Sequence, residues 1–237
     1  MAYNSIKFNK TLMDSHKQFK GHLKVGMSHL HKWEQRFVKW GTPKIPPYVE
    51  TYHLTAMTIV WCGGVLLFGF LAQYNIQWLW GSSAMILLQY LTDLFDGAVG
   101  RHRNTGLVKW GYYADHFLDY MFMCCILIGY TFFIPDRFGF MFFILMVYGG
   151  FMVNAFVSFG ALNEFRVSYF GIGPTEGRIG FIAANTMLAI FGQTYLSQFL
   201  PHVLVAASIA LIVVVYYTQK KIWAIDMKAK QGLGTKD

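Results

Sequence analysis

Mostly apolar stretches, each long enough to cross a bilayer, divide most of this chain and constrain its fold more than any other feature. We count six, at about 52–72, 76–97, 110–134, 138–162, 175–197 and 200–222. A transmembrane helix needs roughly 20 such residues, because its backbone polar groups must all bond within the helix. The connections between the stretches are short. The sequence therefore predicts an all-α integral membrane protein, a bundle of six transmembrane helices.

The balance of apolar and charged residues supports this fold class. Hydrophobic residues make up 55% of the chain and charged residues 14%, against roughly 25% charged residues in an average soluble domain. The net charge of +8 comes from basic residues that flank the apolar stretches. We therefore expect anionic lipid headgroups, and no nucleic acid, as their partner.

The distribution of basic residues predicts the orientation in the membrane. An even number of spans places both termini on one side. With the six stretches above, only Arg137 of the 20 Lys and Arg residues falls on the opposite side. Because basic residues concentrate on the cytoplasmic side of membrane proteins, we expect both termini and the linker between the second and third stretches to be cytoplasmic.

The segment before the first apolar stretch predicts a helix that lies on the membrane. Apolar and aromatic side chains recur there at helical spacing, with Lys and His between them: Phe19, Leu23, Leu30, Trp33, Phe37 and Trp40. A basic amphipathic helix of this kind lies in the headgroup layer; the alternative is a solvated helix that packs on another protein. The segment TPKIPPYVE should end the helix. We therefore divide the chain into an interfacial segment (1–50), a six-span domain (51–223) and a cytoplasmic tail (224–237).

Four aspartates lie beside hydrocarbon, where an unpaired carboxylate is costly, around the linker between the second and third stretches. Asp93 and Asp96 are three residues apart, and Asp115 and Asp119 are four apart, so each pair shares one face of its helix. Antiparallel helices would bring the two pairs together at one membrane depth. Carboxylates this close repel one another and need counter-charge.

Two kinds of counter-charge fit the sequence. The first is a structural ion network with Arg101, Arg103 and Lys109. The second is a set of divalent cations, since an all-oxygen ligand set suits Mg²⁺, Mn²⁺ or Ca²⁺. Two such ions close together are the usual device for phosphoryl transfer.

Small and basic residues stand between the two acidic pairs. Gly97 and Gly100 follow the first pair, and Gly111 precedes the second; glycines let a helix or a ligand approach the backbone closely. Arg101 offers a fork of donors suited to a phosphate. The whole order is Asp-x2-Asp-Gly-x2-Gly-Arg-x9-Gly-x3-Asp-x3-Asp.

This order resembles the signature of the CDP-alcohol phosphotransferase family, Asp-x2-Asp-Gly-x2-Ala-Arg-x8-Gly-x3-Asp-x3-Asp. Seven of the eight fixed positions match; Gly100 replaces the alanine, and the spacer after Arg101 is one residue longer, in a loop that Gly106 can bend. The six-span architecture also resembles the family core, over about residues 45–222. The family's usual Asn near the start of the first span has no match, and Tyr52 stands there instead.

The resemblance implies a role for each matching residue. The residues that would hold two divalent cations, Mg²⁺ or Mn²⁺, are Asp93, Asp96, Asp115 and Asp119. Asp119 would also act as general base on the acceptor hydroxyl. The residues that would bind the nucleotide half of the donor are Gly97, Gly100, Arg101, Gly111 and Thr55.

Two shorter likenesses point to one branch of the family, the choline and ethanolamine phosphotransferases. His116 follows Asp115 in ADHFLD, and GPTEG opens the fifth stretch. His116 could take the hydroxyl proton, because imidazole exchanges protons near neutral pH; it could equally be a satisfied residue at the membrane interface. Glu176 is a further catalytic candidate, although an acidic residue in a first turn also offsets the helix dipole. Arg178 could bind a phosphate or reach the lipid headgroups.

We therefore expect a membrane enzyme of phospholipid biosynthesis that transfers a substituted phosphate from a CDP-alcohol to an acceptor hydroxyl and releases CMP. The leading version moves phosphocholine or phosphoethanolamine to diacylglycerol. The alternative uses CDP-diacylglycerol and a small polar alcohol, such as an inositol phosphate or glycerol phosphate, with Arg166 and Arg178 on the acceptor phosphate.

The same residues leave a protein of another class open, and the expected reaction implies its partners. A divalent-cation transporter or a non-catalytic metal-binding membrane protein is the alternative from another class. The expected partners are the CDP-alcohol donor, the lipid acceptor and the bilayer. Because dimers are common in the resembling family, a homodimer is compatible with the sequence.

Overall fold

The computed structural model describes residues 30–104, 107–136, 138–162, 173–192 and 194–233. Within these ranges the protein is all-helical and has no strand. Its α-helices are α2 (His31–Gly41), α3 (Thr51–Ala72), α4 (Leu79–Arg103), α5 (Val108–Thr131), α6 (Phe140–Leu162), α7 (Pro174–Phe191) and α8 (Thr194–Leu233). Two short 3-10 helices, η1 (Thr42–Lys44) and η2 (Ile76–Trp78), precede α3 and α4. The long helices α3 to α8 correspond in order to the apolar stretches of the sequence.

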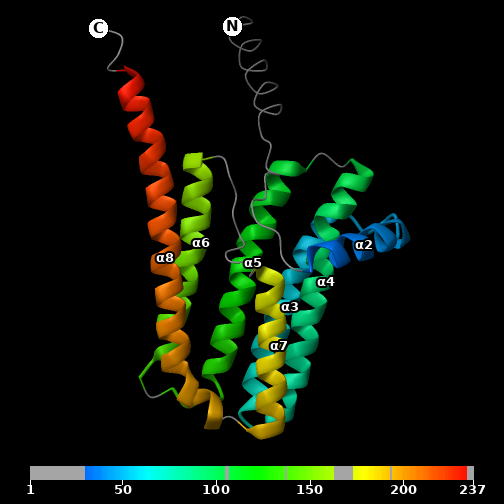
Figure 1. The fold of residues 1–237 in the computed structure, drawn as a ribbon. Coiled ribbons are helices and arrows are strands. Elements are labelled where there is room, and N and C mark those ends of the chain that lie inside the picture. The colour runs from blue at the N-terminus through cyan, green and yellow to red at the C-terminus, as the bar shows by residue number, and fades with distance from the viewer. Residues whose placement is uncertain (1–29, 105–106, 137, 163–172, 193, 234–237) are drawn as a thin grey trace, which may run out of the picture.

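The long helices run up and down beside one another, and α2 lies across them (Figure 1). α3 packs on α4 and α5, and α4 also packs on α7. α6 and α8 form a pair at one side of this group. Because successive long helices are antiparallel, α4 ends at the same end of the bundle at which α5 begins. The two acidic pairs therefore lie at one end of the bundle.

Among the described residues, three helical segments are long and apolar enough to cross a membrane: α3, α6, and Ser197–Gln231 within α8. Large apolar side chains on α6 and α8 face outward, among them Phe142 (72% exposed) and Ile212 (68% exposed). Broad exposed apolar surfaces are typical of a protein that faces lipid. α4, α5 and α7 carry the charged residues of the candidate site, and these lower their hydropathy. The helix composition is that of an integral membrane protein.

α8 is longer than the sequence predicts. The last apolar stretch ends near residue 222, whereas the helix continues to Leu233. No Gly or Pro lies between Pro201 and Gly232, so nothing in the local sequence stops the helix. The 40 residues of α8 span about 60 Å at 1.5 Å per residue, whereas the hydrocarbon core of a bilayer is about 30 Å thick. α8 is therefore about twice as long as that core is thick.

The contact between α3 and α5 is tight. Val65, Phe122 and Ile126 are at most 1% exposed. Where the two helices cross, Gly69 lies against Gly129, and a Cβ on Gly69 would lie 2.8 Å from the Cα of Gly129. Small residues at such a crossing let the two backbones approach closely, which is how many helices associate within a membrane.

A buried set of polar side chains connects α4, α5 and α7. The Tyr130 hydroxyl donates to Asn185 Oδ1 at 2.7 Å, and Asn185 Nδ2 donates to Ser83 Oγ at 3.1 Å. Each group has a partner, so burying it away from water does not leave an unsatisfied donor or acceptor. This set fixes α7 against α4 and α5.

The helix predicted before the first span is present from His31 to Gly41, and the earlier part of its predicted range lies outside the described residues. The chain then turns at η1, where TPKIPPYVE was expected to end the helix. Arg103, the last residue of α4, binds the loop between η1 and α3. Its guanidinium donates to the carbonyl oxygens of Ile45, Pro46, Pro47 and Val49. α2 and the start of α3 are thereby attached to the end of α4 that carries the aspartates.

Candidate functional site

Three of the four aspartates converge at this end of the bundle. One carboxylate oxygen from each of Asp93 (α4), Asp115 and Asp119 (both α5) lies within 4.8 Å of the other two. Asp115 and Asp119 are four residues apart and share one face of α5, and Asp93 meets them from α4. The three side chains are between 20% and 30% exposed. We call Asp93, Asp115 and Asp119 the acidic cluster.

Asp96 is bonded to α3 and is not part of the acidic cluster. It is 3% exposed, and Thr55 Oγ1 donates to its Oδ2 at 2.6 Å. Thr51 Oγ1 donates to the main-chain oxygen of Asp96 at 3.3 Å. The other carboxylate oxygen, Oδ1, is buried and has no hydrogen-bond partner among the described residues. An acceptor in that situation is costly, and a cation would satisfy it.

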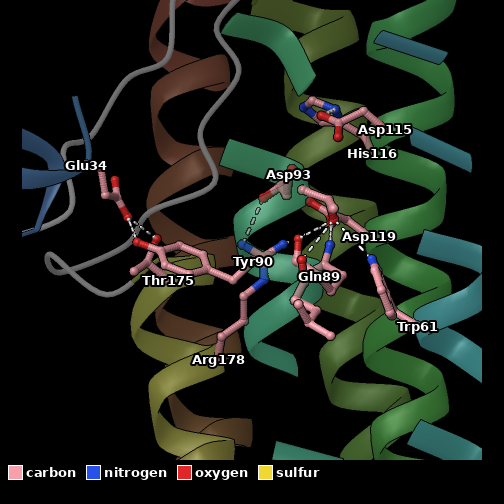
Figure 2. Close-up of polar contacts among 12 residues, drawn as sticks. Glu34, Trp61, Gln89, Tyr90, Asp93, Asp115, His116, Asp119, Thr175 and Arg178 are labelled. Atoms are coloured by element: carbon pink, nitrogen blue, oxygen red, sulfur yellow. Dashed lines mark hydrogen bonds and ion pairs between the residues drawn. The ribbon is translucent and has the colours of Figure 1, made fainter. Parts of the chain in front are cut away.

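Arg178, on α7, supplies counter-charge to the acidic cluster (Figure 2). Its Nη1 lies 2.9 Å from Asp93 Oδ2, and its Nη2 lies 3.0 Å from Asp119 Oδ1. The Arg178 side chain is only 6% exposed, and its planar fork of donors suits two carboxylates at once. The ion pairs that the structure describes for the acidic cluster therefore come from Arg178. The ion network expected from the sequence used other cations, Arg101, Arg103 and Lys109. Of these, Arg103 bonds the loop before α3 instead.

Gln89 holds the same oxygen of Asp119. Its Nε2 donates to Asp119 Oδ1 at 2.8 Å, and its side chain is fully buried. Gln89 lies four residues before Asp93 on α4, so the two share a helix face. Asp119 thus receives donors from α4 and α7 on one oxygen, which fixes the orientation of its carboxylate.

A second polar group lies next to Arg178 and joins three helices. Glu34, on α2, accepts hydrogen bonds on Oε1 from the Tyr90 hydroxyl at 2.8 Å and from Thr175 Oγ1 at 2.7 Å (Figure 2). Tyr90 belongs to α4 and Thr175 to the first turn of α7. The Arg178 guanidinium lies over the Tyr90 ring, with 5.8 Å between Cζ and the ring centroid.

His116 and Glu176 have close partners of their own. His116 Nδ1 lies 3.2 Å from Asp115 Oδ2, and the imidazole packs against the Tyr112 ring at 4.5 Å between centroids. Glu176 Oε2 accepts a hydrogen bond from the Gly173 main-chain N–H at 2.8 Å. Such a bond caps the start of α7, so the helix-end interpretation of Glu176 has a structural basis. Their catalytic roles stay predictions.

The residues expected to bind the nucleotide lie around the end of α4. At Gly97 a Cβ would lie 3.1 Å from Nη1 of Arg101, so the missing side chain lets Arg101 fold back along its helix. A Cβ at Gly111 would meet no heavy atom within 4 Å, which leaves that face of α5 open. Gly100 lies one turn beyond Asp96 on α4. Thr55 contacts the aspartates directly, through its hydrogen bond to Asp96.

Sequence reasoning missed Gln89, Tyr90, Thr175 and Glu34, and it did not connect Arg178 to the aspartates. Two features of the sequence could have indicated Gln89 and Arg178. Gln89 precedes Asp93 by one helical turn, and Arg178 is an ionisable residue inside an apolar stretch, where a charged partner is expected. No pattern in the sequence pairs Glu34 with residues on two helices far along the chain.

These features agree with a known family. The model of the CDP-alcohol phosphatidyltransferase family matches residues 52–219, a range that includes the acidic cluster and Arg178. The chain belongs to this family, which confirms the predicted resemblance at the level of the family. Its members are transferases of phospholipid biosynthesis that act on CDP-alcohols and generally depend on divalent cations. Neither the curated proteins nor the solved structures gave a match to this chain.

The donor set fits a divalent cation. The acidic cluster offers carboxylate oxygens alone, the ligand type of Mg²⁺ and Mn²⁺. Asp96 Oδ1, on the same helix as Asp93, adds a buried acceptor without a donor among the described residues. The residues present therefore suit the metal on which the family generally depends.

Proposed function

We propose that this protein transfers phosphocholine or phosphoethanolamine from the CDP-alcohol to diacylglycerol and releases CMP. The observation that carries the proposal is the convergence of Asp93, Asp115 and Asp119 within 4.8 Å, in a chain whose family acts on CDP-alcohols. The acceptor oxygen attacks the β-phosphorus of the donor. The bond from that phosphorus to the bridging oxygen breaks, and CMP leaves with the electron pair.

Asp119 takes the proton of the acceptor hydroxyl. Gln89 and Arg178 both donate to its Oδ1, which leaves Oδ2 as the oxygen that receives the proton. The two donors also hold the carboxylate in one orientation, and a fixed base of this kind contributes about 10²–10⁴-fold to a rate. His116, beside Asp115, is the second candidate for this proton.

The aspartates Asp93, Asp96, Asp115 and Asp119 hold divalent cations, Mg²⁺ or Mn²⁺. When bound, these ions neutralise charge on the phosphates and stabilise the leaving group. The glycines Gly97, Gly100 and Gly111 let the nucleotide approach α4 and α5 closely, and Arg101 donates to its phosphates. Thr55 positions Asp96 through the bond to Oδ2.

The chain crosses the membrane six times in this proposal, with α4, α5 and α7 as the less apolar spans. The acidic cluster lies at the cytoplasmic face, because the basic residues of the linkers and tail gather on that side. A water-soluble donor then enters from the cytoplasm, while the lipid acceptor enters sideways from the bilayer. α2 lies in the headgroup layer, since Trp33 and Trp40 are 69% and 62% exposed beside basic residues.

One observation favours a second candidate, phosphatidyl transfer from CDP-diacylglycerol to a small phosphorylated alcohol. Arg178 lies within the site, on Asp93 and Asp119, where a guanidinium could receive the phosphate of such an acceptor. Arg166, the other residue expected on that phosphate, lies outside the described residues.

Release of CMP by the purified full-length protein in lipid, with Mg²⁺ or Mn²⁺, tests the proposal. CDP-choline, CDP-ethanolamine and CDP-diacylglycerol are offered in parallel, the first two with diacylglycerol. We expect CMP from a CDP-aminoalcohol and its loss with a chelator. Asp119→Asn should lower the rate by about 10²–10⁴-fold, while Asp226→Asn, at an exposed position on α8, should not.

The other outcomes separate the alternatives. CMP from CDP-diacylglycerol alone would support the second candidate, and a comparison of phosphorylated acceptors would follow. No CMP from any donor, by protein that still binds Mn²⁺, would contradict a transferase and favour a cation transporter or a non-catalytic metal-binding protein.

A further inference from the structure

Glu34 is the point at which α2 is attached to the walls of the site. One oxygen, Oε1, accepts from Tyr90 on α4 and from Thr175 on α7, at 2.8 and 2.7 Å. Thr175 is buried, while Glu34 and Tyr90 are half-buried. A charged acceptor makes hydrogen bonds about twice as strong as a neutral one does. Glu34 therefore ties together three helices that are far apart in the sequence.

Tyr90 and Thr175, the two donors to Glu34, each connect it to Arg178. The Tyr90 ring lies under the guanidinium, 5.8 Å from Cζ, so the hydroxyl bond to Glu34 sets where that ring lies. Thr175 precedes Arg178 by three residues on α7, so the two side chains share a helix face. The bond from Thr175 to Glu34 therefore fixes the turn of α7 that carries Arg178.

We propose that Glu34 is a positioning residue for the acidic cluster. Through Tyr90 and Thr175, Glu34 holds Arg178 against the aspartates Asp93 and Asp119. The inference rests on the metal-binding part of the proposed function. Arg178 offsets part of the negative charge of the acidic cluster when no cation is bound, and its positive charge opposes the entry of a cation. Because Glu34 keeps Arg178 in that place, α2 sets how readily the aspartates accept a metal.

The direction in which the Mn²⁺ affinity changes tests this role of Glu34. Substitutions that loosen Arg178 should make Mn²⁺ bind more tightly, since the competing guanidinium leaves the carboxylates more easily. Damage to the site would do the opposite, because aspartates that lose their arrangement bind a cation more weakly. The direction of the change therefore distinguishes positioning of Arg178 from general support of the fold.

Titration of the full-length protein in lipid with Mn²⁺ alone, read by electron paramagnetic resonance of the free ion, tests this. Tyr90→Phe keeps the ring and removes the donor, and Thr175→Val removes the other donor. We expect each to tighten Mn²⁺ binding by about fivefold, the size of one lost hydrogen bond, and Glu34→Ala to do so by at least as much. Thr175→Ser, which keeps the hydroxyl, and Gln35→Ala, an exposed neighbour on α2, should leave the affinity unchanged.

The same substitutions in an Arg178→Gln background complete the test. There we expect Tyr90→Phe and Glu34→Ala to have no effect on Mn²⁺ affinity, since the group through which they act is absent. Weaker or unchanged Mn²⁺ binding in the single variants, or equal tightening without Arg178, would overturn the proposal. Because the titration needs no substrate, wild-type protein that binds Mn²⁺ but releases no CMP would contradict the proposed reaction and leave this test intact.

Discussion

Arg178 and Asp119 form an ion pair of 3.0 Å between α7 and α5, within the group of carboxylates that suits a metal. The same guanidinium reaches Asp93 on α4 at 2.9 Å. The Arg178 side chain thus joins three helices, α4, α5 and α7. Carboxylates held this close need positive charge whether or not a metal is bound, and Arg178 provides it in the structure described.

Arg178→Gln should therefore destabilise the protein when metal is absent. Removal of one member of a fully buried ion pair costs about 3 kcal/mol or more; because Asp93 and Asp119 are 20% and 25% exposed, the cost here should be smaller. Since a divalent cation can replace the lost charge, Mn²⁺ should restore much of the stability and raise the melting temperature of the variant more than that of the wild type. Thermal unfolding in detergent, with chelator and with Mn²⁺, measures both effects.

Arg178→Lys is the control for this prediction. A lysine keeps the charge but reaches the two carboxylates less well, because it lacks the planar fork, so its stability without metal should fall between those of the wild type and Arg178→Gln. Equal melting temperatures for Arg178→Gln and the wild type in chelator would show that the ion pairs contribute nothing to stability.

The bond from Thr55 to Asp96 leads to a second prediction. Thr55 Oγ1 is the one described donor to the Asp96 carboxylate, at 2.6 Å, and both residues are buried. Thr55→Val removes this donor at nearly constant volume and should cost about 1–3 kcal/mol, the penalty of an unsatisfied buried acceptor. We also expect a weaker response to Mn²⁺ and Mg²⁺, since Asp96 loses its fixed orientation.

Thr55→Ser is the matched variant, because it keeps the hydroxyl and loses only a methyl group. Its stability and its response to metal should lie close to those of the wild type in the same unfolding and titration experiments. If Thr55→Ser and Thr55→Val behave alike, the hydroxyl is not what holds Asp96.

The positions of the helices could be read from hydropathy wherever an apolar stretch ends at a polar or turn-forming residue. The first stretch, predicted at about 52–72, is α3 (Thr51–Ala72). The fifth was predicted to reach residue 197, yet α7 ends at Phe191, and Gly192 has a φ of 92°. A glycine with positive φ ends a helix. The polar residues that follow it in the sequence, Gln193 and Thr194, are too few to interrupt an apolar stretch that is judged over about 20 residues, so hydropathy alone hides the break.

Part of the candidate site could likewise be predicted from the sequence, and part could not. Spacing along single helices predicted that Asp93, Asp115 and Asp119 could lie at one depth, because that relation depends on helix periodicity and on a short turn. The partners of Arg178 and Glu34 depend instead on how α7 and α2 pack on α4. Such contacts between distant segments arise from the packing of the whole bundle, and the spacing of residues along a single chain does not encode them.

The crossing of α3 and α5 gives the last prediction, which concerns stability alone. Gly69→Ala would place a methyl group 2.8 Å from the backbone of Gly129, so the helices must move apart, at about 1–3 kcal/mol. Gly63→Ala is the matched control on the same helix, since its Cβ would meet no heavy atom within 4 Å; there the better helix propensity of alanine should leave stability equal or slightly higher. Thermal unfolding of both variants measures the difference, and equal melting temperatures would mean that the close approach of α3 and α5 is not required.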